Sequence, residues 1–329
     1  MRRIVLIFAA GVALFAQAPA YSPRRPIHTF SIVARDPVSG DLGVAVQSHW
    51  FNVGSVVISA EPGVGAVATQ SIPDPAYGPL GLQLMKAGKS APEALKALVS
   101  VDPEASVRQV GMVDSKGRAA SHTGAMDIPE AGGIVGEGFA VQANMMAKNT
   151  VWPAMAKAYG DALKDPKLDL ADRLLVALRA AQAEGGDFRG MQSAAILIVK
   201  GTPSGQPWND KLFDLRVEDN ADPIAELARL IQLQRAYSLM NAGDAFVSKN
   251  QWKEALEAYS AAAKLAPQIV ELPYWHAVAL VNGGRVQEAL PIFKEVFRRE
   301  PKWRSAARRL AEVKQLPNDK ALLKLIEAQ

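Results

Sequence analysis

The sequence contains no cysteine and only four histidines, at positions 28, 49, 122 and 276. Without cysteine the chain can form neither a disulfide nor a thiolate nucleophile, so each domain must depend on its hydrophobic core for stability. The four histidines lie far apart and form no His-x-x-x-His pair, which gives a zinc site little support. We therefore expect no metal centre.

The chain also lacks a strong excess of one charge and a long apolar run in its interior. Its 37 Lys and Arg residues and 33 Asp and Glu residues leave a formal charge of only +4, which argues against nucleic acid as a partner. No stretch after the first twenty residues approaches the ~20 apolar residues of a membrane span. With 329 residues, 49% of them hydrophobic, the chain is long enough for two domains.

Residues 1–20 are typical of a secretory signal peptide. Arg2 and Arg3 precede an uncharged apolar run and then small residues, which fit a cleavage site before Tyr21. An uncleaved anchor is the alternative, although the run is short for a membrane span. We expect a periplasmic or secreted bacterial protein, with no stable membrane span after signal cleavage. Residues 21–28 follow as an extended strap or propeptide.

Period-2 alternation begins at Thr29 and predicts a β-hairpin around a turn rich in Asp, Pro and Gly. Strands are predicted at 29–34, 42–48, 56–60, 65–70, 108–113, 119–122, 139–142 and 193–199, helices at 77–86, 91–99, 150–163 and 170–183, and a glycine-rich loop at 132–138. Because strands and helices come in separate groups, we predict an α+β fold with helices packed outside two stacked sheets.

From Asp222 onwards the pattern is helical only, beginning with an N-cap residue and a proline. Three residues recur 34 positions later: Ala255 as Ala289, Tyr259 as Phe293 and Pro267 as Pro301. The period and these residue types resemble the tetratricopeptide (TPR) repeat. The resemblance implies an all-α domain at 222–329, with repeats at about 236–269 and 270–303, a helical cap at 304–329, and a protein or peptide partner in its groove.

Two motif-like stretches lack the context that their chemistry requires. Residues 63–68 fit the dinucleotide pattern G-x-G-x-x-A, but no helix follows to present its N-terminus to a pyrophosphate, so we expect no cofactor. His122, near Ser121 and Asp127, is either part of a catalytic triad or, as we favour, the polar end of a hairpin.

Six segments in succession resemble the DUF1028 family, an uncharacterised group assigned to the N-terminal nucleophile (Ntn) hydrolases. They are TFSIVARDPVSGDLGVAVQS, GVGAVATQS, PAYGPLGLQLMKAGKSAPEAL, RQVGMVDSKGRAASHTG, GEGFAVQAN and GGDFRGMQSAAILIV. The resemblance implies a four-layer αββα sandwich over residues 29–217. One departure is Ala143 in Gln-Ala-Asn, where the family usually has glycine.

The resemblance also implies a site. In Ntn hydrolases the first residue of the first strand is the nucleophile, and its free α-amine is the general base. Thr29 occupies that position. From their place in turn-rich motifs, Gly65 and Asn144 are our candidates for the region of the oxyanion. Signal cleavage before Tyr21 would leave residues 21–28 ahead of Thr29, so a second cut at the His28–Thr29 bond is required.

Two main hypotheses follow. In the first, the protein is an exported Ntn-type amide or peptide bond hydrolase with Thr29 as nucleophile. In the second, the αββα domain is catalytically silent, and the protein is a binding or scaffold protein that acts through its repeats. Assembly into homo-oligomers through the repeats is a third alternative.

Overall fold

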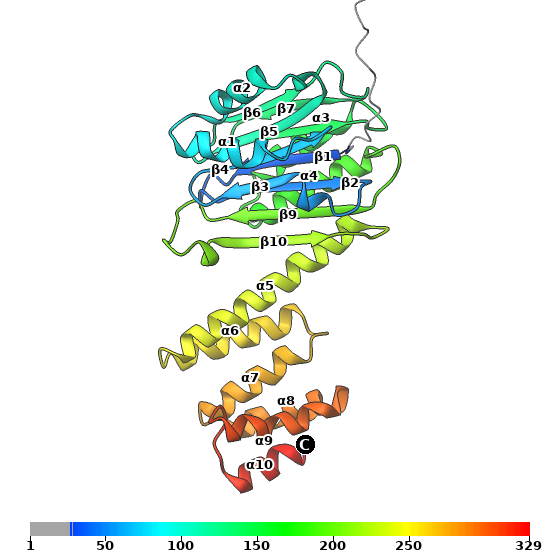
Figure 1. Ribbon diagram of the computed structural model, residues 1–329. Helices are drawn as coiled ribbons and strands as arrows, with labels where there is room; N and C mark the ends of the chain where they lie inside the picture. Colours follow the sequence, from blue (N-terminus) through cyan, green and yellow to red (C-terminus); the bar gives the residue numbers. More distant parts are fainter. Residues whose placement is uncertain (1–26, 28) are drawn as a thin grey trace, which may run out of the picture.

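The computed structural model describes residue 27 and residues 29–329, and the chain forms two parts in succession (Figure 1). The first part contains two antiparallel sheets with helices, and the second part is helical throughout. A mixed α and β domain followed by a helical region is therefore confirmed. The predicted signal peptide, and all of the strap except Ile27, lie outside the described residues.

The larger sheet has six strands in the order β10-β9-β2-β1-β8-β7. Their bounds are β1 Thr29–Arg35, β2 Leu42–Ser48, β7 Gly132–Gly136, β8 Phe139–Asn144, β9 Ser193–Val199 and β10 Lys211–Val217. Strands β1 and β2 form the predicted hairpin, and Thr29 pairs with Ser48. Its turn is held by Asp36, whose Oδ1 accepts hydrogen bonds from the backbone amides of Val38 and Ser39.

The smaller sheet has four strands in the order β3-β4-β5-β6. Their bounds are β3 Ile58–Glu61, β4 Gly65–Ser71, β5 Arg108–Asp114 and β6 Ala119–Thr123. Each of the four was predicted from period-2 alternation, within a few residues of these bounds. Short turns join β3 to β4 and β5 to β6, so the local sequence signal was sufficient for these two hairpins, whereas α1 and α2 lie between β4 and β5 in the chain.

Helices cover the outer faces of both sheets, so the layer order is helix, sheet, sheet, helix. Helices α1 (Tyr77–Lys86) and α2 (Ala91–Val101) pack on the smaller sheet. Helices α3 (Val151–Ala162) and α4 (Leu170–Ala183) pack on the larger sheet. In β1, Phe30 and Ile32 belong to the core beneath α3 and α4, whereas Val33 belongs to the core between the sheets.

Two strands were not predicted. The expected glycine-rich loop begins with β7, whose glycines leave room for neighbouring rings: a Cβ on Gly132 would lie 2.6 Å from the Trp152 ring, and one on Gly136 would collide with Phe139. Strand β10 has the sequence KLFDLRV and lies at the sheet edge, where exposed charged residues interrupt the apolar alternation. In both strands the pairing partner, rather than the local pattern, determines the structure.

The second part consists of helices packed around their own hydrophobic core. Their bounds are α5 Pro223–Val247, α6 Trp252–Leu265, α7 Glu271–Asn282, α8 Val286–Arg299, α9 Arg304–Glu312 and α10 Lys320–Glu327. Helices α6 and α8 have the same length and begin 34 residues apart. Where α5 crosses α6, Gly243 lies against the Tyr259 ring, and a Cβ there would be only 2.6 Å from that ring.

Helix α5 belongs to both parts. Its N-terminal residues, including Leu227 and Ile231, pack into the core of the first part, and Ala236 and Met240 pack into the second. The change of core therefore lies between Ile231 and Ala236, inside a continuous helix, whereas the sequence pattern changes at Asp222. None of the helices in the described part of the chain is long and apolar enough to cross a membrane.

Candidate functional site

Thr29 is the first residue of β1 and lies between β2 and β8, opposite Ser48 on one side and Asn144 on the other. Its side chain is fully buried. The hydroxyl Oγ1 donates to the carbonyl oxygen of Ile27 (3.0 Å) and is 3.3 Å from Ser48 Oγ. Among the described residues, these two hydrogen-bond partners of the Thr29 hydroxyl are uncharged.

The chain leaves the larger sheet immediately before Thr29. Ile27 instead pairs with Ser71 at the end of β4 in the smaller sheet, through Ile27 N to Ser71 O (2.5 Å) and Ser71 N to Ile27 O (3.0 Å). Ser71 has a left-handed backbone with φ +71°, which is unfavourable for serine. Its hydroxyl donates to Asp127 Oδ1 (2.6 Å). Burial of this carboxyl has the larger effect on the pKa of Asp127 and raises it overall, whereas the hydrogen bond alone lowers the pKa.

A network of buried amide side chains connects the two sheets behind Thr29. Gln70 Nε2 donates to the Thr29 carbonyl oxygen (3.1 Å) and to Gln109 Oε1 (2.6 Å). Gln109 Nε2 donates in turn to the carbonyl oxygen of Ala143 (2.8 Å). Ser31 donates to Gln70 Oε1 and accepts from Gln142 Nε2, both at 2.6 Å.

Sequence reasoning missed this network, although a signal was present. Gln70, Gln109 and Gln142 each stand within an otherwise largely apolar strand, at a position that faces the other sheet. All three are fully buried. An amide that is retained inside a hydrophobic layer needs partners, because an unpaired buried amide costs about 1–3 kcal/mol. Only the packing of the sheets showed which partners those were.

Asn144 lies beside Thr29, as required for a residue near the oxyanion, but its amide is already oriented. Its Nδ2 donates to Gln109 Oε1 (2.9 Å), whereas its Oδ1 is buried and has no hydrogen-bond partner among the described residues. The free group of Asn144 beside the site is therefore mainly an acceptor. Such an acceptor suits an ammonium or an amide N–H better than an oxyanion.

Asp187 lies just beyond the start of β1, in the loop before β9. Its Oδ2 accepts from the backbone amide of His49 (3.2 Å), and its backbone bridges to Met146. Asp187 therefore links His49, which follows β2, to Met146, which follows β8. Arg189 neutralises this buried carboxylate, with Nη2 at 2.6 Å from Oδ2. His49 Nδ1 is buried and has no partner in the described part of the chain.

Gly65 is not brought to Thr29. It is the first residue of β4, and Ser71, which contacts Ile27, is the last, roughly 20 Å away along a seven-residue strand. A Cβ at position 65 would lie 2.6 Å from the Val113 carbonyl oxygen and 2.7 Å from Met85 Cε. Packing against α1 thus accounts for this glycine.

The Ser121, His122 and Asp127 group does not form a triad. His122 Nε2 is 2.8 Å from the carbonyl oxygen of Ala105, and Asp127 accepts from Ser71 and from Gly124 N. Ser121 and His122 are adjacent in β6, so their side chains point to opposite faces. Among residues 27 and 29–329, no group of three or more His, Cys, Asp or Glu side chains is arranged to hold a metal.

Comparison with known proteins identifies a family for the first part. The family described as "Family of unknown function (DUF1028)" matches residues 29–227. Among solved structures, the DUF1028 protein SPO2555 from Silicibacter pomeroyi is similar, at 30% sequence identity and a TM-score of 0.55, over 62% of this chain and 88% of that chain. No curated protein matches this sequence.

Proposed function

The chain belongs to the DUF1028 family, and we propose that its first part is an Ntn-type amidohydrolase with Thr29 as nucleophile. The position of Thr29 carries the proposal: it begins a central strand, at the point where the preceding chain leaves the sheet. The layer order of helices and sheets supports an Ntn-hydrolase-like αββα sandwich. The function of the family itself is unknown.

The proposal requires cleavage of the His28–Thr29 bond, and the chain carries a nucleophile for it. The Thr29 hydroxyl oxygen attacks the carbonyl carbon of residue 28, its proton passes to the Thr29 nitrogen, and the C–N bond breaks. The resulting ester is hydrolysed by water, which leaves a carboxylate on residue 28 and restores the hydroxyl. The Ser48 hydroxyl, 3.3 Å from Thr29 Oγ1, is placed to relay the proton.

Turnover of a substrate would follow the same bond changes. The freed α-amine, with a pKa of ~8 in an unperturbed peptide, accepts the hydroxyl proton while Oγ1 attacks an amide carbonyl carbon. The proton then passes to the leaving amine, and water releases the acyl group. In this scheme Asn144 Oδ1, which has no described partner, accepts a hydrogen bond from the α-ammonium, and backbone amides serve the oxyanion.

A second candidate function has its own support. In the chain as described, the Thr29 hydroxyl is buried and hydrogen-bonded to Ile27, upstream of the bond that must be cut. If this bond stays intact, Thr29 has no free amine to act as a base, and the first part is catalytically silent. The protein would then be a scaffold that binds a partner through its helical region.

We further propose that the protein is exported and that the helical region is TPR-like. The leader at residues 1–20 supports export to the periplasm or the medium. The 34-residue displacement between α6 and α8, with Gly243 against Tyr259 at the α5–α6 crossing, supports the repeat assignment. The helices would hold a protein or peptide partner.

Intact mass and N-terminal sequencing of the mature protein test the catalytic proposal. The protein should be expressed with its leader in a bacterial host, and the purified chain should then be incubated for days. A chain that begins at Thr29 supports the hydrolase. A chain that still begins at Tyr21 contradicts it and favours the scaffold.

Variants of Thr29 separate autocatalysis from cleavage by another protease. Thr29→Val keeps the shape of the side chain without the hydroxyl, and Thr29→Ser keeps the hydroxyl. Processing should be lost in the first variant and retained in the second, with unchanged circular dichroism in both. Normal processing of Thr29→Val would assign the cut to another enzyme.

A further inference from the structure

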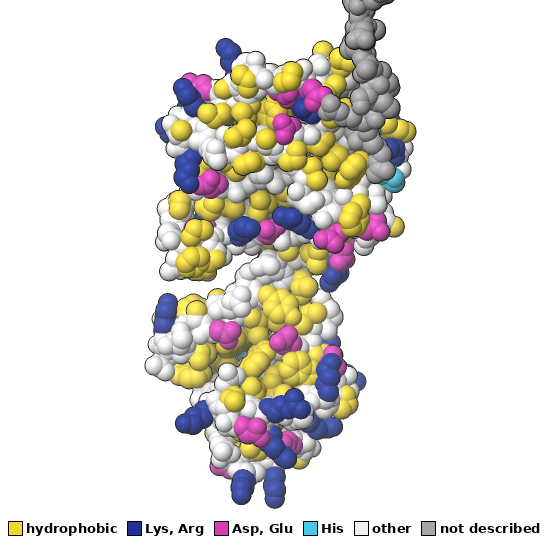
Figure 2. Space-filling view, in the orientation of Figure 1, with side chains coloured by type: hydrophobic (Ala, Val, Ile, Leu, Met, Phe, Trp, Pro, Cys, Tyr) yellow, Lys and Arg dark blue, Asp and Glu magenta, His cyan; other side chains and the backbone are white. Residues whose placement is uncertain are grey.

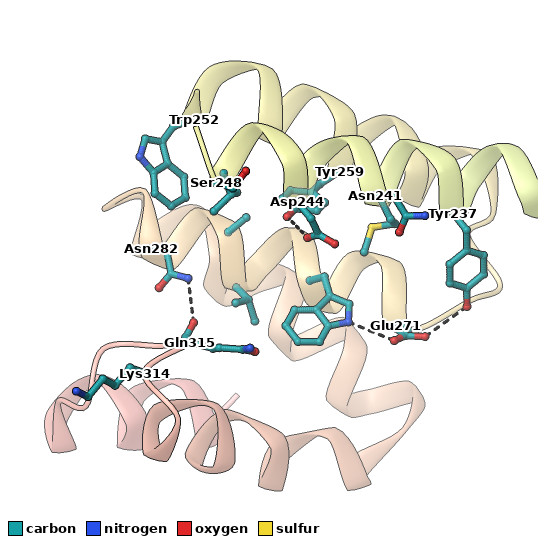
Figure 3. A pocket seen from close by; sticks show the side chains of 15 residues that line it. Tyr237, Asn241, Asp244, Ser248, Trp252, Tyr259, Glu271, Asn282, Lys314 and Gln315 are labelled. Carbon is teal, nitrogen blue, oxygen red and sulfur yellow. Dashed lines mark hydrogen bonds between the residues drawn. The ribbon is translucent and has the colours of Figure 1, made fainter. Parts of the chain in front are cut away.

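The helical region contains a cavity of about 810 Å³ between α5, α6 and α7, closed at one end by the loop after α9. Figure 3 shows the side chains that line it. On the surface, Figure 2 shows hydrophobic side chains gathered over this region with single acidic ones among them, whereas Lys and Arg are concentrated toward its lower end. The volume is in the range of pockets that hold small ligands or side chains of a partner.

The lining follows the repeat. Tyr237 in α5 and Ser248, directly after α5, line one wall, and the residues 34 positions later, Glu271 and Asn282 in α7, line the facing wall. Each set recurs along one helix at a spacing of three or four residues, so the cavity is formed by one face of each helix. It is therefore a product of the repeat geometry and not a local packing defect.

Two carboxylates face this cavity. Glu271 accepts from Trp275 Nε1 (3.2 Å) and from the Tyr237 hydroxyl (3.3 Å), and these contacts hold the carboxylate at one end of the groove (Figure 3). Asp244 accepts from the Tyr259 hydroxyl at 2.6 Å through Oδ1. All of these donors are neutral, so neither charge is cancelled by its hydrogen bonds.

Aromatic rings complete the lining of the cavity, and the ammonium of Lys314, which also lines it, points away from the carboxylates. Trp252, Trp275 and Tyr237 contribute rings to the wall. Lys314, in the loop after α9, has its ammonium directed away from Asp244 and Glu271 in Figure 3. A cavity that combines carboxylates with aromatic faces attracts a cation through both charge and ring quadrupole.

We propose that this cavity binds an extended peptide through a basic side chain, with arginine preferred. The guanidinium would pair with Asp244 or Glu271 and stack on a tryptophan, while the amides of Asn241 and Asn282 bind the peptide backbone. This inference rests on the proposed partner binding by the helical region and is independent of catalysis at Thr29. Charge complementarity selects this occupant over an acidic or purely apolar segment.

Fluorescence anisotropy of a labelled, end-blocked Gly-Ser peptide with two arginines tests the proposal. The control peptide carries citrulline at both positions, which keeps the shape but removes the charge. The arginine peptide should bind to the full-length protein, more weakly as salt is raised, and the citrulline peptide at least about tenfold more weakly. Equal binding of both peptides, or no binding of either up to about 1 mM, overturns the proposal.

Matched variants locate the site. Asp244→Asn and Glu271→Gln keep the acceptors for Tyr259, Tyr237 and Trp275, and each should weaken the arginine peptide by about tenfold. Glu257→Gln removes an exposed carboxylate from α6 that lies outside this cavity and should leave binding unchanged. A loss in Glu257→Gln equal to that in the other two would show non-specific charge attraction and reject the site. Repeating the peptide titration with the Thr29→Val variant, in which processing should be lost, separates peptide binding from processing.

Discussion

The side chain of Asn144 in the larger sheet donates to Gln109 Oε1 in the smaller sheet at 2.9 Å. This hydrogen bond connects the two sheets directly beside Thr29 and fixes which end of the Asn144 amide is free. Because Gln109 also accepts from Gln70 (2.6 Å), which itself donates to the Thr29 carbonyl oxygen, a single buried amide orients both Asn144 and Gln70 beside the candidate nucleophile.

Replacing Gln109 should therefore cost more stability than any exposed glutamine. Gln109→Leu removes the acceptor of Asn144 Nδ2 and one of the acceptors of Gln70 Nε2, and we expect a loss of about 2–4 kcal/mol in the free energy of unfolding. Urea denaturation followed by tryptophan fluorescence measures it. Gln83→Leu, on the exposed face of α1, is the control and should change the free energy by less than about 0.5 kcal/mol. Similar values for the two would show that the network contributes little.

Ser48 should affect processing more than folding. Ser48→Ala removes the hydroxyl 3.3 Å from Thr29 Oγ1, and we expect cleavage before Thr29 to slow by about tenfold or more. The rate is followed by intact mass over time. Ser193→Ala is the matched control, because this buried serine in the adjacent strand donates to the Trp50 carbonyl oxygen instead. An unchanged rate in Ser48→Ala would remove Ser48 from the proposed proton relay.

The buried pair of Arg108 and Asp102 predicts a pH dependence. Burial raises the pKa of Asp102, but hydrogen bonds from Arg108 Nε (2.9 Å), from the backbone amide of Glu104 and from the Tyr77 hydroxyl outweigh it, so the pKa is lowered overall. A carboxyl whose pKa is lowered by folding stabilises the folded protein at pH values above its unfolded-state pKa, near ~3.9. This stabilisation is lost as the pH falls through the folded-state pKa.

Asp102→Asn should therefore destabilise the protein at pH 7 by about 2–3 kcal/mol, and the difference from the unsubstituted protein should shrink below about pH 4. Urea denaturation at a series of pH values tests this. Glu137→Gln, an exposed carboxylate, should show no such trend. A difference that stays constant down to acid pH would mean that packing, and not the charge, explains the loss.

Arg235 should couple the helical region to the first part. Its Nη2 lies 2.6 Å from Asp169 Oδ2 and 2.9 Å from Asp172 Oδ2 on α4. A double-mutant cycle of Arg235→Met and Asp172→Asn should give a coupling of about 1 kcal/mol that weakens with salt. The exposed pair Arg229 and Glu226, within α5, is the control at about 0.3–0.5 kcal/mol. Equal coupling free energies for both pairs would mean that Arg235 does not stabilise the contact between the two parts.

Local patterns predicted most elements of the first part. The Thr29–Ser48 hairpin, helix α4 and strand β9 were predicted closely, because apolar periodicity and turn residues act over a few neighbouring positions. Strands β7 and β10 were missed, since glycine and edge residues carry no such periodicity. The expected place of Gly65 near the oxyanion failed because a motif does not reveal which end of a strand faces the site.

The sequence by itself determined the two-part organisation, the first residue of β1 and the 34-residue displacement in the helices. These features follow from composition, from apolar alternation and from sequence repetition, which can be recognised without knowing which residues are in contact. Only the tertiary structure decided that Gln109 orients Asn144, that Ile27 crosses to Ser71, and that α5 belongs to two cores. Such contacts join residues far apart in sequence, and they form because buried polar groups must find partners and apolar faces must be covered.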